Sequence, residues 1–279
     1  MMEVSVSTWS LSKCGSTMEE WFRTAKAAGI SYLDFTLDAC YQIFDWRQVS
    51  EEEVFAYFSE VKKLAATYGL KVFQTHAPYA GFPDYLDEEY FGQTVKAIAA
   101  TAALGAKYTV GHPFPFPLYG KKNMWEKERA FTVRYYKRFI PALEKYGVTM
   151  CVENIYDWDN GNIRQVGFSD TKNIASIAEE LGEYFGTCLD TGHYALYGGN
   201  QAQAVRELGK TLKVLHIHDS FGVKDDHLIP RLGGIDWSGF TDALKEVGYE
   251  GTLNMELKPY PYMDSAAGFV FAKERMLSL

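Results

Sequence analysis

Residues 214–219, Val-Leu-His-Ile-His-Asp, form a short run in which aliphatic residues alternate with histidines before a terminal carboxylate. A short apolar run of this length, rich in β-branched residues, predicts a buried β-strand. Similar runs recur along the 279-residue chain, and together they predict eight strands. The expected strands are residues 3–8, 32–36, 71–75, 108–111, 149–153, 186–190, 214–219 and 252–256.

The segments between these runs carry the start and stop signals of helices. Ser16 with Glu19, and Ser50 with Glu53, have the spacing of a capping box, in which two side chains satisfy each other's free amides. Apolar residues in the second segment recur with helical spacing, at Val54, Tyr57, Phe58, Val61, Leu64 and Ala65. Glycines shortly before the next strand predict the helix ends, at Gly29, Gly69, Gly105, Gly147, Gly182 and Gly248.

Regular alternation of strands and helices predicts an α/β protein with a parallel sheet. Eight such units without a long interruption favour a closed (β/α)8 TIM barrel over an open, doubly wound sheet. No GxGxxG motif follows the first strand, which disfavours a dinucleotide-binding fold. Because no linker or charge block divides the chain, a single domain over residues 1–279 is expected, with the longest loops after strands 2, 4 and 5.

Composition narrows the class of protein. The formal net charge is −8, whereas a nucleic-acid-binding protein is normally basic, so nucleic acid is disfavoured as a partner. The four cysteines are scattered, and neither a secretory signal nor an apolar run long enough for a membrane helix is present. A cytoplasmic enzyme without a disulfide framework is therefore expected. Aromatic residues make up 15% of the chain and suit a pocket for a small polar substrate or a surface for a homo-oligomer.

Histidines gather where a barrel enzyme carries its chemistry. Active sites of such barrels lie at the C-terminal ends of the strands. The chain has six histidines, and one of them, His227, lies in the loop after the seventh expected strand. The other five lie at strand ends, namely His76, His112, His193, His216 and His218. A lone histidine is more often structural than functional, but a set of this size at one end of a barrel predicts a site.

Carboxylates complete the pattern. Glu153, Asp190 and Glu256 each close an apolar strand, so three acidic groups are expected to meet at the barrel mouth. Such groups repel one another and are costly to bury unless a cation lies between them. His216 is expected as the fourth ligand, while His218, on the same strand face, is expected to support the ligands or the loop. The mixed oxygen and imidazole set suits Mn²⁺, Co²⁺, Zn²⁺, Fe²⁺ or Mg²⁺.

The loop over residues 224–237 is polar and rich in turn-forming residues. It is either an ordinary solvated turn or a segment that folds Asp225 and His227 over the mouth. In the second interpretation Gly233 and Gly234 permit a tight return, and Asp236 caps the following helix.

These segments resemble one known group of proteins. VEN (152–154), LDTGH (189–193), HIHD (216–219), MEL (255–257) and DxHxxPxxGGIDW (225–237) look like the motifs of the xylose-isomerase-like barrel superfamily. That group includes sugar and sugar-phosphate isomerases and epimerases, together with the endonuclease IV class of abasic-site nucleases. The resemblance covers nearly the whole chain, is strongest over residues 153–256, and is specific for the superfamily rather than for one member.

The ketose 3-epimerase branch implies one metal, bound by Glu153, Asp190, His216 and Glu256. In that branch the two glutamates also serve as the acid–base pair on opposite faces of the substrate carbon, and His193 lies near the substrate. Arg231 is displaced from the position of the epimerases' arginine, so the resemblance does not assign it a role.

The nuclease branch implies three zinc ions and a larger ligand set. The matching positions are His76, His112, Glu153, Asp190, His193, His216, Asp225, His227 and Glu256. The chain therefore has ligands for one ion and for up to three, unless the additional residues contact substrate instead. Loops 10–17 and 37–50, which would meet DNA, contain only Lys13 and Arg47 as basic residues, a small number for phosphate contacts.

The function that this pattern predicts is a metal-dependent isomerase or epimerase of a keto sugar or sugar derivative, in which two glutamates move a proton through a metal-stabilised enediolate. An abasic-site nuclease, a metal-dependent lyase or dehydratase, and a non-catalytic binding protein are the alternatives. The residues expected to wall the pocket or bind hydroxyls are Trp9, Tyr79, Asn154, Trp158, Lys258 and Tyr260.

Overall fold

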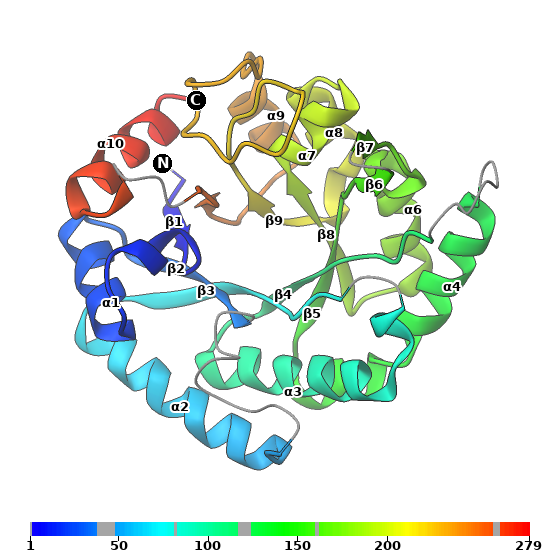
Figure 1. Ribbon diagram of the computed structural model, residues 1–279, viewed down its shortest axis with the longest axis horizontal. Coiled ribbons are helices and arrows are strands. Elements are labelled where there is room, and N and C mark those ends of the chain that lie inside the picture. Colours follow the sequence, from blue (N-terminus) through cyan, green and yellow to red (C-terminus); the bar gives the residue numbers. More distant parts are fainter. Residues whose placement is uncertain (1, 38–47, 81–82, 117–123, 160–161, 259–262) are drawn as a thin grey trace.

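The computed structural model describes residues 2–37, 48–80, 83–116, 124–159, 162–258 and 263–279. Eight parallel strands form a barrel with helices around its outside (Figure 1). These strands are β1 (Val4–Ser7), β2 (Tyr32–Thr36), β3 (Lys71–His76), β4 (Tyr108–Gly111), β5 (Thr149–Glu153), β8 (Phe185–Asp190), β9 (Leu212–His216) and β10 (Leu253–Met255). Every predicted strand overlaps an observed one; the prediction for β9 started two residues late and ran beyond its end at His216.

The strands follow the order β10-β1-β2-β3-β4-β5-β8-β9, and each neighbouring pair is parallel. Closure occurs between β9 and β10, where Ile217 forms a parallel bridge to Met255. Ile217 N donates to Asn254 O at 2.8 Å, and Glu256 N donates to Ile217 O at 3.2 Å. The predicted TIM barrel is thereby confirmed.

Helices connect the strands and cover the outside of the barrel. The longer ones are α1 (Met18–Ala27), α2 (Glu51–Thr67), α3 (Glu88–Leu104), α4 (Trp125–Lys137), α6 (Thr171–Leu181), α8 (Gln201–Leu208) and α10 (Ala266–Leu277). The short ones are α5 (Ile140–Tyr146), α7 (Thr191–Tyr197), α9 (Phe240–Glu246), η1 (Ser10–Lys13), η3 (Asp84–Leu86), η4 (Gly167–Ser169) and η5 (Gly209–Thr211). The last helix, α10, packs beside α1, where Lys273 donates to the carbonyl of Gly29 (Figure 1).

Local capping follows the sequence signals with one shift. The predicted box at α2 is confirmed, since Ser50 Oγ accepts from Glu53 N at 3.1 Å and Glu53 Oε2 accepts from Ser50 N at 2.7 Å. The predicted box at α1 is wrong by one residue. Thr17 adopts the extended backbone of a cap and pairs with Glu20, whose carboxylate accepts from both Thr17 N and Ser16 N.

Two apolar layers lie on either side of the sheet. The larger core fills the space between strands and helices, whereas Val110, Cys151, Cys188 and Val214 form a separate small cluster. Side chains alternate along a strand, so residues two positions beyond this cluster share its face. Glu153, Asp190 and His216 are therefore held on the barrel interior at the strand ends. The described cysteines, Cys14, Cys151 and Cys188, are free thiols, as the sequence predicted.

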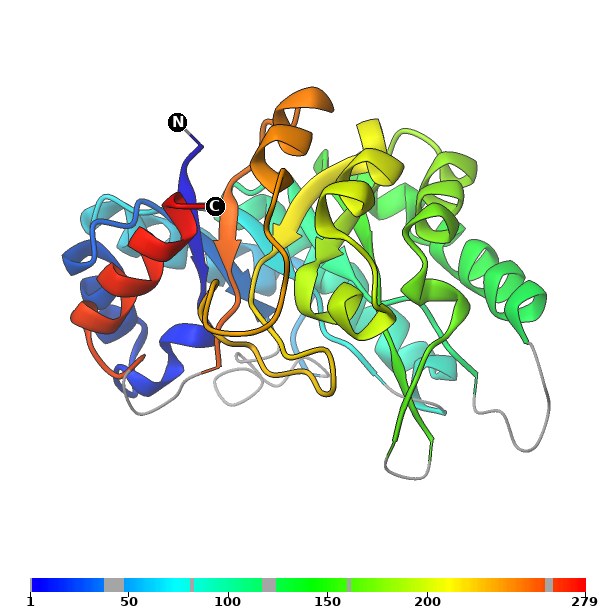
Figure 2. The ribbon, with the colours of Figure 1, turned by 90° about the horizontal axis from the view of Figure 1, so that it is seen from above.

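All eight strands run in the same direction, so their C-terminal ends share one edge of the barrel (Figure 2). A hairpin of β6 (Asp157–Asp159) and β7 (Asn162–Arg164) projects beyond this edge. Among the described residues, no helix has the length and apolar character needed to cross a membrane.

Candidate metal centre

Four strand ends converge at the mouth of the barrel. Glu153, Asp190 and His216 are the last residues of β5, β8 and β9, and Glu256 directly follows β10. Each offers one ligand atom, and these four atoms all lie within 4.8 Å of one another. The structure therefore brings together the four residues that the sequence predicted as the metal-binding set.

His216 lies close to both glutamates of this set. Its Nδ1 is 2.9 Å from Glu153 Oε1 and 3.5 Å from Glu256 Oε2. Asp190 caps helix α7, because its Oδ1 accepts from His193 N at 2.6 Å. The side chains of Glu153 and His216 are 1% and 0% exposed, so water cannot compensate their charges.

A second group of ligands adjoins Glu153 on its other oxygen. Glu153 Oε2 is 2.9 Å from His112 Nε2 and 3.5 Å from His76 Nε2. The two imidazole nitrogens are 3.2 Å apart. His76, His112 and Glu153 thus point three ligand atoms at one position. Glu153 is shared between this group and the central set, by which we mean Glu153, Asp190, His216 and Glu256.

A third group surrounds Asp225. Asp225 Oδ2 lies 2.8 Å from His227 Nε2 and 3.5 Å from His193 Nε2. His218 Nε2 lies 3.7 Å from Asp225 Oδ1 and 3.0 Å from Asp190 Oδ2, and its ring stacks on His227 with centroids 3.9 Å apart. The loop that carries Asp225 and His227 folds over the mouth, as one of the two interpretations of residues 224–237 expected.

Backbone carbonyls select the tautomers of three of these histidines. Nδ1 of His76, His193 and His227 lies 2.7, 2.9 and 2.8 Å from the carbonyl oxygens of Ala77, Asn154 and Glu256, respectively. A carbonyl only accepts hydrogen bonds, so each Nδ1 carries a proton. When the ring is neutral, Nε2 presents a lone pair toward the mouth, which is how metal-binding histidines are oriented.

His216 is oriented in the opposite sense by Asp34, a residue that the sequence analysis missed. Asp34 Oδ2 is 3.2 Å from His216 Nε2, and it accepts from Asn254 Nδ2 at 2.8 Å and Gln74 Nε2 at 3.3 Å. This arrangement leaves His216 Nδ1 for the ligand position. The signal was available, because a charged residue at the centre of the buried strand β2 needs a partner.

The charges of the site match the demands of a cation. Burial opposes ionisation of Glu153, but His216 and His112 overcome it and hold the pKa of this carboxyl well below its usual value. Burial likewise opposes protonation of His193, yet Asp190 and Asp225 raise the pKa of His193 well above its usual value. Protonated His193 and His216, whose pKa values the neighbouring carboxylates raise, therefore neutralise the carboxylates of the metal-free protein, whereas burial lowers the pKa of His112. A divalent cation fits the same positions by displacing those protons.

This exchange of protons for metal predicts two opposite trends with pH: one in the stability of the metal-free protein, and one in the additional stability that bound metal gives. Burial favours neutral His227, but its hydrogen bond to Asp225 and the Asp225 charge raise the pKa of His227 to about 9. Because that pKa lies above the unfolded value of about 6.5, the stabilisation is complete below about pH 6.5 and is lost as the pH rises through about 9. We expect the melting temperature of chelator-treated protein to fall over this interval, while the increment produced by added Zn²⁺ or Mn²⁺ grows. Parallel pH profiles of thermal unfolding measure both trends, and a metal increment that shrinks with pH contradicts the assignment.

Asp219 anchors the loop that carries Asp225 and His227. Its Oδ2 accepts from Arg231 N and Trp237 Nε1, and its Oδ1 accepts from Ser220 N and Ile235 N, at 2.7–3.0 Å. Left-handed backbone occurs at His227 and Arg231, not at Gly233 or Gly234. Gly233 instead allows a close approach, since a Cβ there would lie 2.4 Å from Asp219 Oδ1.

Asp236 and Arg231, in the same loop, make contacts with the protein backbone. Asp236 does not cap the next helix, because α9 begins at Phe240 with Gly239 as its N-cap; Asp236 Oδ1 accepts from Ser238 N instead. Arg231 donates to Ser278 O at 2.6 Å, near the C-terminus, which accords with the absence of a site role.

Replacing Asp219 by alanine should lower the free energy of unfolding by about 2–4 kcal/mol, because four donors, two of them on the buried residues Ser220 and Trp237, lose a charged acceptor that is itself buried. Asp236→Ala is the matched control: it removes one exposed hydrogen bond of the same loop and should change the free energy of unfolding much less. Urea unfolding followed by tryptophan fluorescence measures both. Equal costs for the two substitutions contradict the anchoring role.

The residues predicted to contact substrate occupy varied positions, and their roles remain predictions. Trp9 packs edge-on against His227 with centroids 5.0 Å apart, and Tyr79, 61% exposed, lies against the His112 ring. Asn154 exchanges two hydrogen bonds with the backbone of Asp190, so it also positions that ligand. Lys258 is exposed beyond β10.

Of the predicted aromatic residues, Trp158 is described only in its backbone and Tyr260 not at all, while another aromatic residue enters the site unpredicted. Trp158 pairs with Ile163 in the hairpin, but its side chain, like the whole of Tyr260, lies outside the described residues. Tyr156 was not among the predicted site residues. Its hydroxyl donates to Asp225 Oδ2 at 3.4 Å, and its ring packs edge-on against His193.

Two curated proteins are similar in sequence to about half of this chain. An inosose isomerase of Bacillus subtilis is 25% identical over 160 residues, which is 55% of each chain. A D-psicose 3-epimerase of Enterocloster bolteae is 25% identical over 135 residues, covering 48% of this chain and 42% of the relative. The chain spans less than two thirds of the length of three other curated relatives that it matches, namely 28%, 63% and 60%.

Solved structures show the same fold. The structure of the IOLI protein with a bound zinc atom superimposes with a TM-score of 0.72 at 18% identity, covering 99% of this chain and 97% of that one. The family model described as "Xylose isomerase-like TIM barrel" matches residues 22–274. The chain therefore belongs to the xylose isomerase-like TIM barrel family, whose members among its relatives include sugar isomerases and epimerases.

Proposed function

We propose that the protein is a metal-dependent isomerase or epimerase of a keto sugar or sugar derivative. The observation that carries the proposal is the placement of two glutamates, Glu153 and Glu256, beside the same imidazole nitrogen at 2.9 and 3.5 Å. Proton transfer at the carbon next to a carbonyl requires a base and an acid, and two carboxylates beside one metal position can supply both.

Glu153, Asp190, His216 and Glu256 would hold the ion. A divalent cation bound there supplies a Lewis acid that polarises a substrate carbonyl and stabilises the enediolate formed when the neighbouring proton is lost. The mixed ligand set suits Mn²⁺, Co²⁺, Zn²⁺ or Mg²⁺.

The two glutamates differ in their surroundings and can therefore divide the proton transfers. Glu153 is buried and held ionised by His216 and His112, which suits it to remove the proton next to the carbonyl. The Glu256 side chain is 14% exposed, with its Oε2 3.5 Å from His216 Nδ1, and can deliver or receive a proton there. Return of the proton to the other face of the carbon gives epimerisation, and delivery to the neighbouring carbon gives isomerisation.

The two flanking groups favour a second candidate function. His76 and His112 with Glu153, and His193 and His227 with Asp225, could hold two further ions, so that the mouth holds up to three. Several adjacent metal ions can activate water and stabilise both oxygens of a phosphoester displacement. A zinc-dependent abasic-site nuclease is therefore the alternative.

One experiment separates the two functions. Chelator-treated protein is reloaded with Mn²⁺, Co²⁺, Zn²⁺ or Mg²⁺, its metal content is measured, and it is incubated in D2O with a panel of ketoses and inososes. We expect metal-dependent deuterium incorporation next to a carbonyl, observed by NMR. Incision of abasic DNA without deuterium incorporation in any substrate contradicts the proposal and supports the nuclease.

A further inference from the structure

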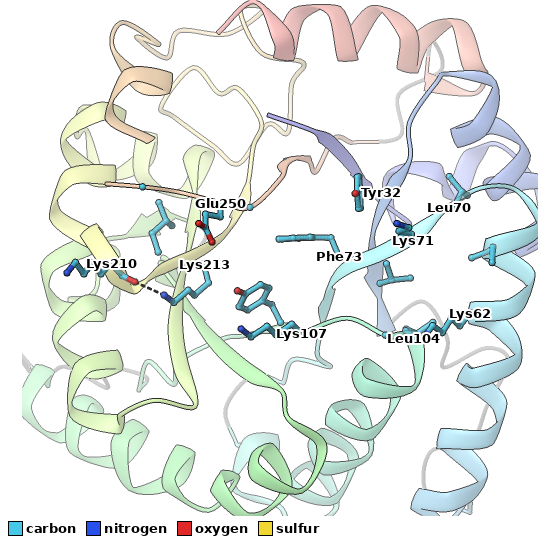
Figure 3. A pocket seen from close by; sticks show the side chains of 18 of the residues that line it. Tyr32, Lys62, Leu70, Lys71, Phe73, Leu104, Lys107, Lys210, Lys213 and Glu250 are labelled. Atoms are coloured by element: carbon cyan, nitrogen blue, oxygen red, sulfur yellow. Dashed lines mark hydrogen bonds between the residues drawn. The ribbon is translucent and has the colours of Figure 1, made fainter. Parts of the chain in front are cut away.

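A second concave site lies at the other end of the barrel. It is a cavity of about 960 Å³ formed by the first residues of β2, β3, β4 and β9 and by the turns that precede them (Figure 3). β3 runs from Lys71 in this cavity to His76 at the mouth, a separation of roughly 16 Å for five residues at 3.3 Å each. A ligand in this cavity therefore does not reach the metal centre.

The cavity is strongly basic on a chain whose net charge is −8. Its lining contains five lysines and one carboxylate, Glu250. The lysines come from separate segments of the chain, namely Lys62, Lys71, Lys107, Lys210 and Lys213. Figure 3 shows Lys210 and Lys213 on one side, Lys62 and Lys71 on the other, and Phe73 between them.

These ammonium groups have no acidic partner among the described residues. Several lysines outside the cavity do pair with a carboxylate, as in Lys63–Glu60, Lys145–Glu51 and Lys245–Asp242. In the cavity, Lys213 Nζ donates to Lys210 O at 2.7 Å, and Lys107 lies 5.7 Å from the Tyr108 ring centroid. Unpaired charges of one sign around a concave surface concentrate the field and attract a counter-ion.

Glycines make room for two of the lysine side chains. A Cβ at Gly105 would lie 2.7 Å from Lys62 Nζ, and a Cβ at Gly186 would lie 2.5 Å from Lys213 Cγ. The turn after α3 and the strand β8 thus accommodate lysines that lie across them toward the cavity.

The floor of the cavity is aromatic. Phe73 lies edge-on to Tyr32, with centroids 6.4 Å apart, and tilted against Tyr108, with centroids 5.7 Å apart. All three rings are half-buried, so each leaves part of its surface to the cavity. Such rings offer a stacking surface for a flat ligand.

We propose that this cavity binds a small organic polyanion with a flat aromatic part, the chemistry of a nucleoside di- or triphosphate. The lysines supply charge for phosphate groups, and Phe73 with its neighbours supplies the surface for the ring. The volume lies in the range of small-molecule sites. The acidic balance of the whole chain opposes a long nucleic acid, which would extend beyond the cavity.

The test measures binding to chelator-treated protein, so that no metal at the mouth can attract phosphate. Calorimetric titrations use ATP, tripolyphosphate and adenosine at low salt. We expect ATP to bind more tightly than either of its parts. Lys107→Glu and Lys213→Glu should each weaken ATP binding by about tenfold or more, which is about 1.4 kcal/mol. Phe73→Leu should weaken ATP binding but not tripolyphosphate binding.

Lys127→Glu on α4 is the matched control, since Lys127 is exposed and lies outside the cavity. It should leave ATP affinity unchanged, and the thermal unfolding of every variant shows whether the fold survives. Failure of ATP to bind, or equal losses in Lys107→Glu and Lys127→Glu, overturns the proposal. Tighter binding of a DNA oligomer than of ATP, lost in the same lysine variants, also overturns it in favour of nucleic acid. Because binding is measured without metal, the result is independent of the reaction at the mouth.

Discussion

Glu153→Gln should lower the rate of metal-dependent proton exchange by about 10³-fold or more, while the barrel remains folded. Glu153 contacts the central set through Oε1 and the histidine pair through Oε2, so its charge serves two groups of ligands. Glutamine has nearly the same shape but neither the charge nor the basicity. Metal content should therefore fall together with turnover.

Two further substitutions make this result specific. Glu256→Gln should also abolish exchange, yet it should reduce metal content less, because Glu256 belongs to only one of the candidate ligand groups. Glu128→Gln is the control: Glu128 is buried, and its Oε1 accepts from Phe116 N at 2.7 Å, but it belongs to none of the ligand groups. Deuterium incorporation and elemental analysis report both quantities. A near-normal rate of proton exchange in Glu153→Gln contradicts the assignment of Glu153 to the acid–base pair.

Asp34→Asn should weaken metal affinity by about 10- to 100-fold, although Asp34 lies on the far side of His216 from the ligand position. The Asp34 carboxylate faces His216 Nε2 at 3.2 Å and makes the ring a stronger ligand through Nδ1. Asparagine removes the charge, and its amide can also face His216 Nε2 as a donor. That contact would favour the tautomer with its proton on Nδ1, which leaves no lone pair there for the metal.

Competition with a chromophoric chelator measures this affinity directly, without reference to turnover. Ser5→Ala is the appropriate control, since Ser5 is buried in the same interior and bonds to Asn254 and Thr252 but not to His216. We expect Ser5→Ala to change stability and to leave metal affinity within about twofold. Unchanged affinity in Asp34→Asn contradicts a positioning role for Asp34.

Strand periodicity explains why so much of the centre was predictable. Glu153 and Asp190 each end a short apolar run and His216 lies in a third, and a parallel barrel necessarily brings the C-terminal ends of such runs to one edge. Alternation over the predicted strand 214–219 also predicted that His216 and His218 share one face. These inferences needed only the period of a strand and the direction of the chain.

The backbone conformation of the loop over residues 224–237 was less predictable, because turns depend on tertiary contacts as well as on residue type. Gly233 was expected to provide a turn, but its missing side chain admits Asp219 instead. Left-handed backbone falls on His227 and Arg231, where the hydrogen bonds to Asp219 and Glu256 hold the chain. Residue type alone predicts turns at glycines and does not identify such positions.

The sequence alone determined the barrel, the edge that carries its chemistry and the four residues that meet there, because these follow from local periodicity and strand direction. Only the tertiary structure decided how His216 is oriented, since Asp34 and Asn254, which share a hydrogen bond, are 220 residues apart. It also decided that five lysines from separate segments line one cavity at the opposite end. Such contacts join positions that no local pattern relates, and closure of the barrel is what brings them together.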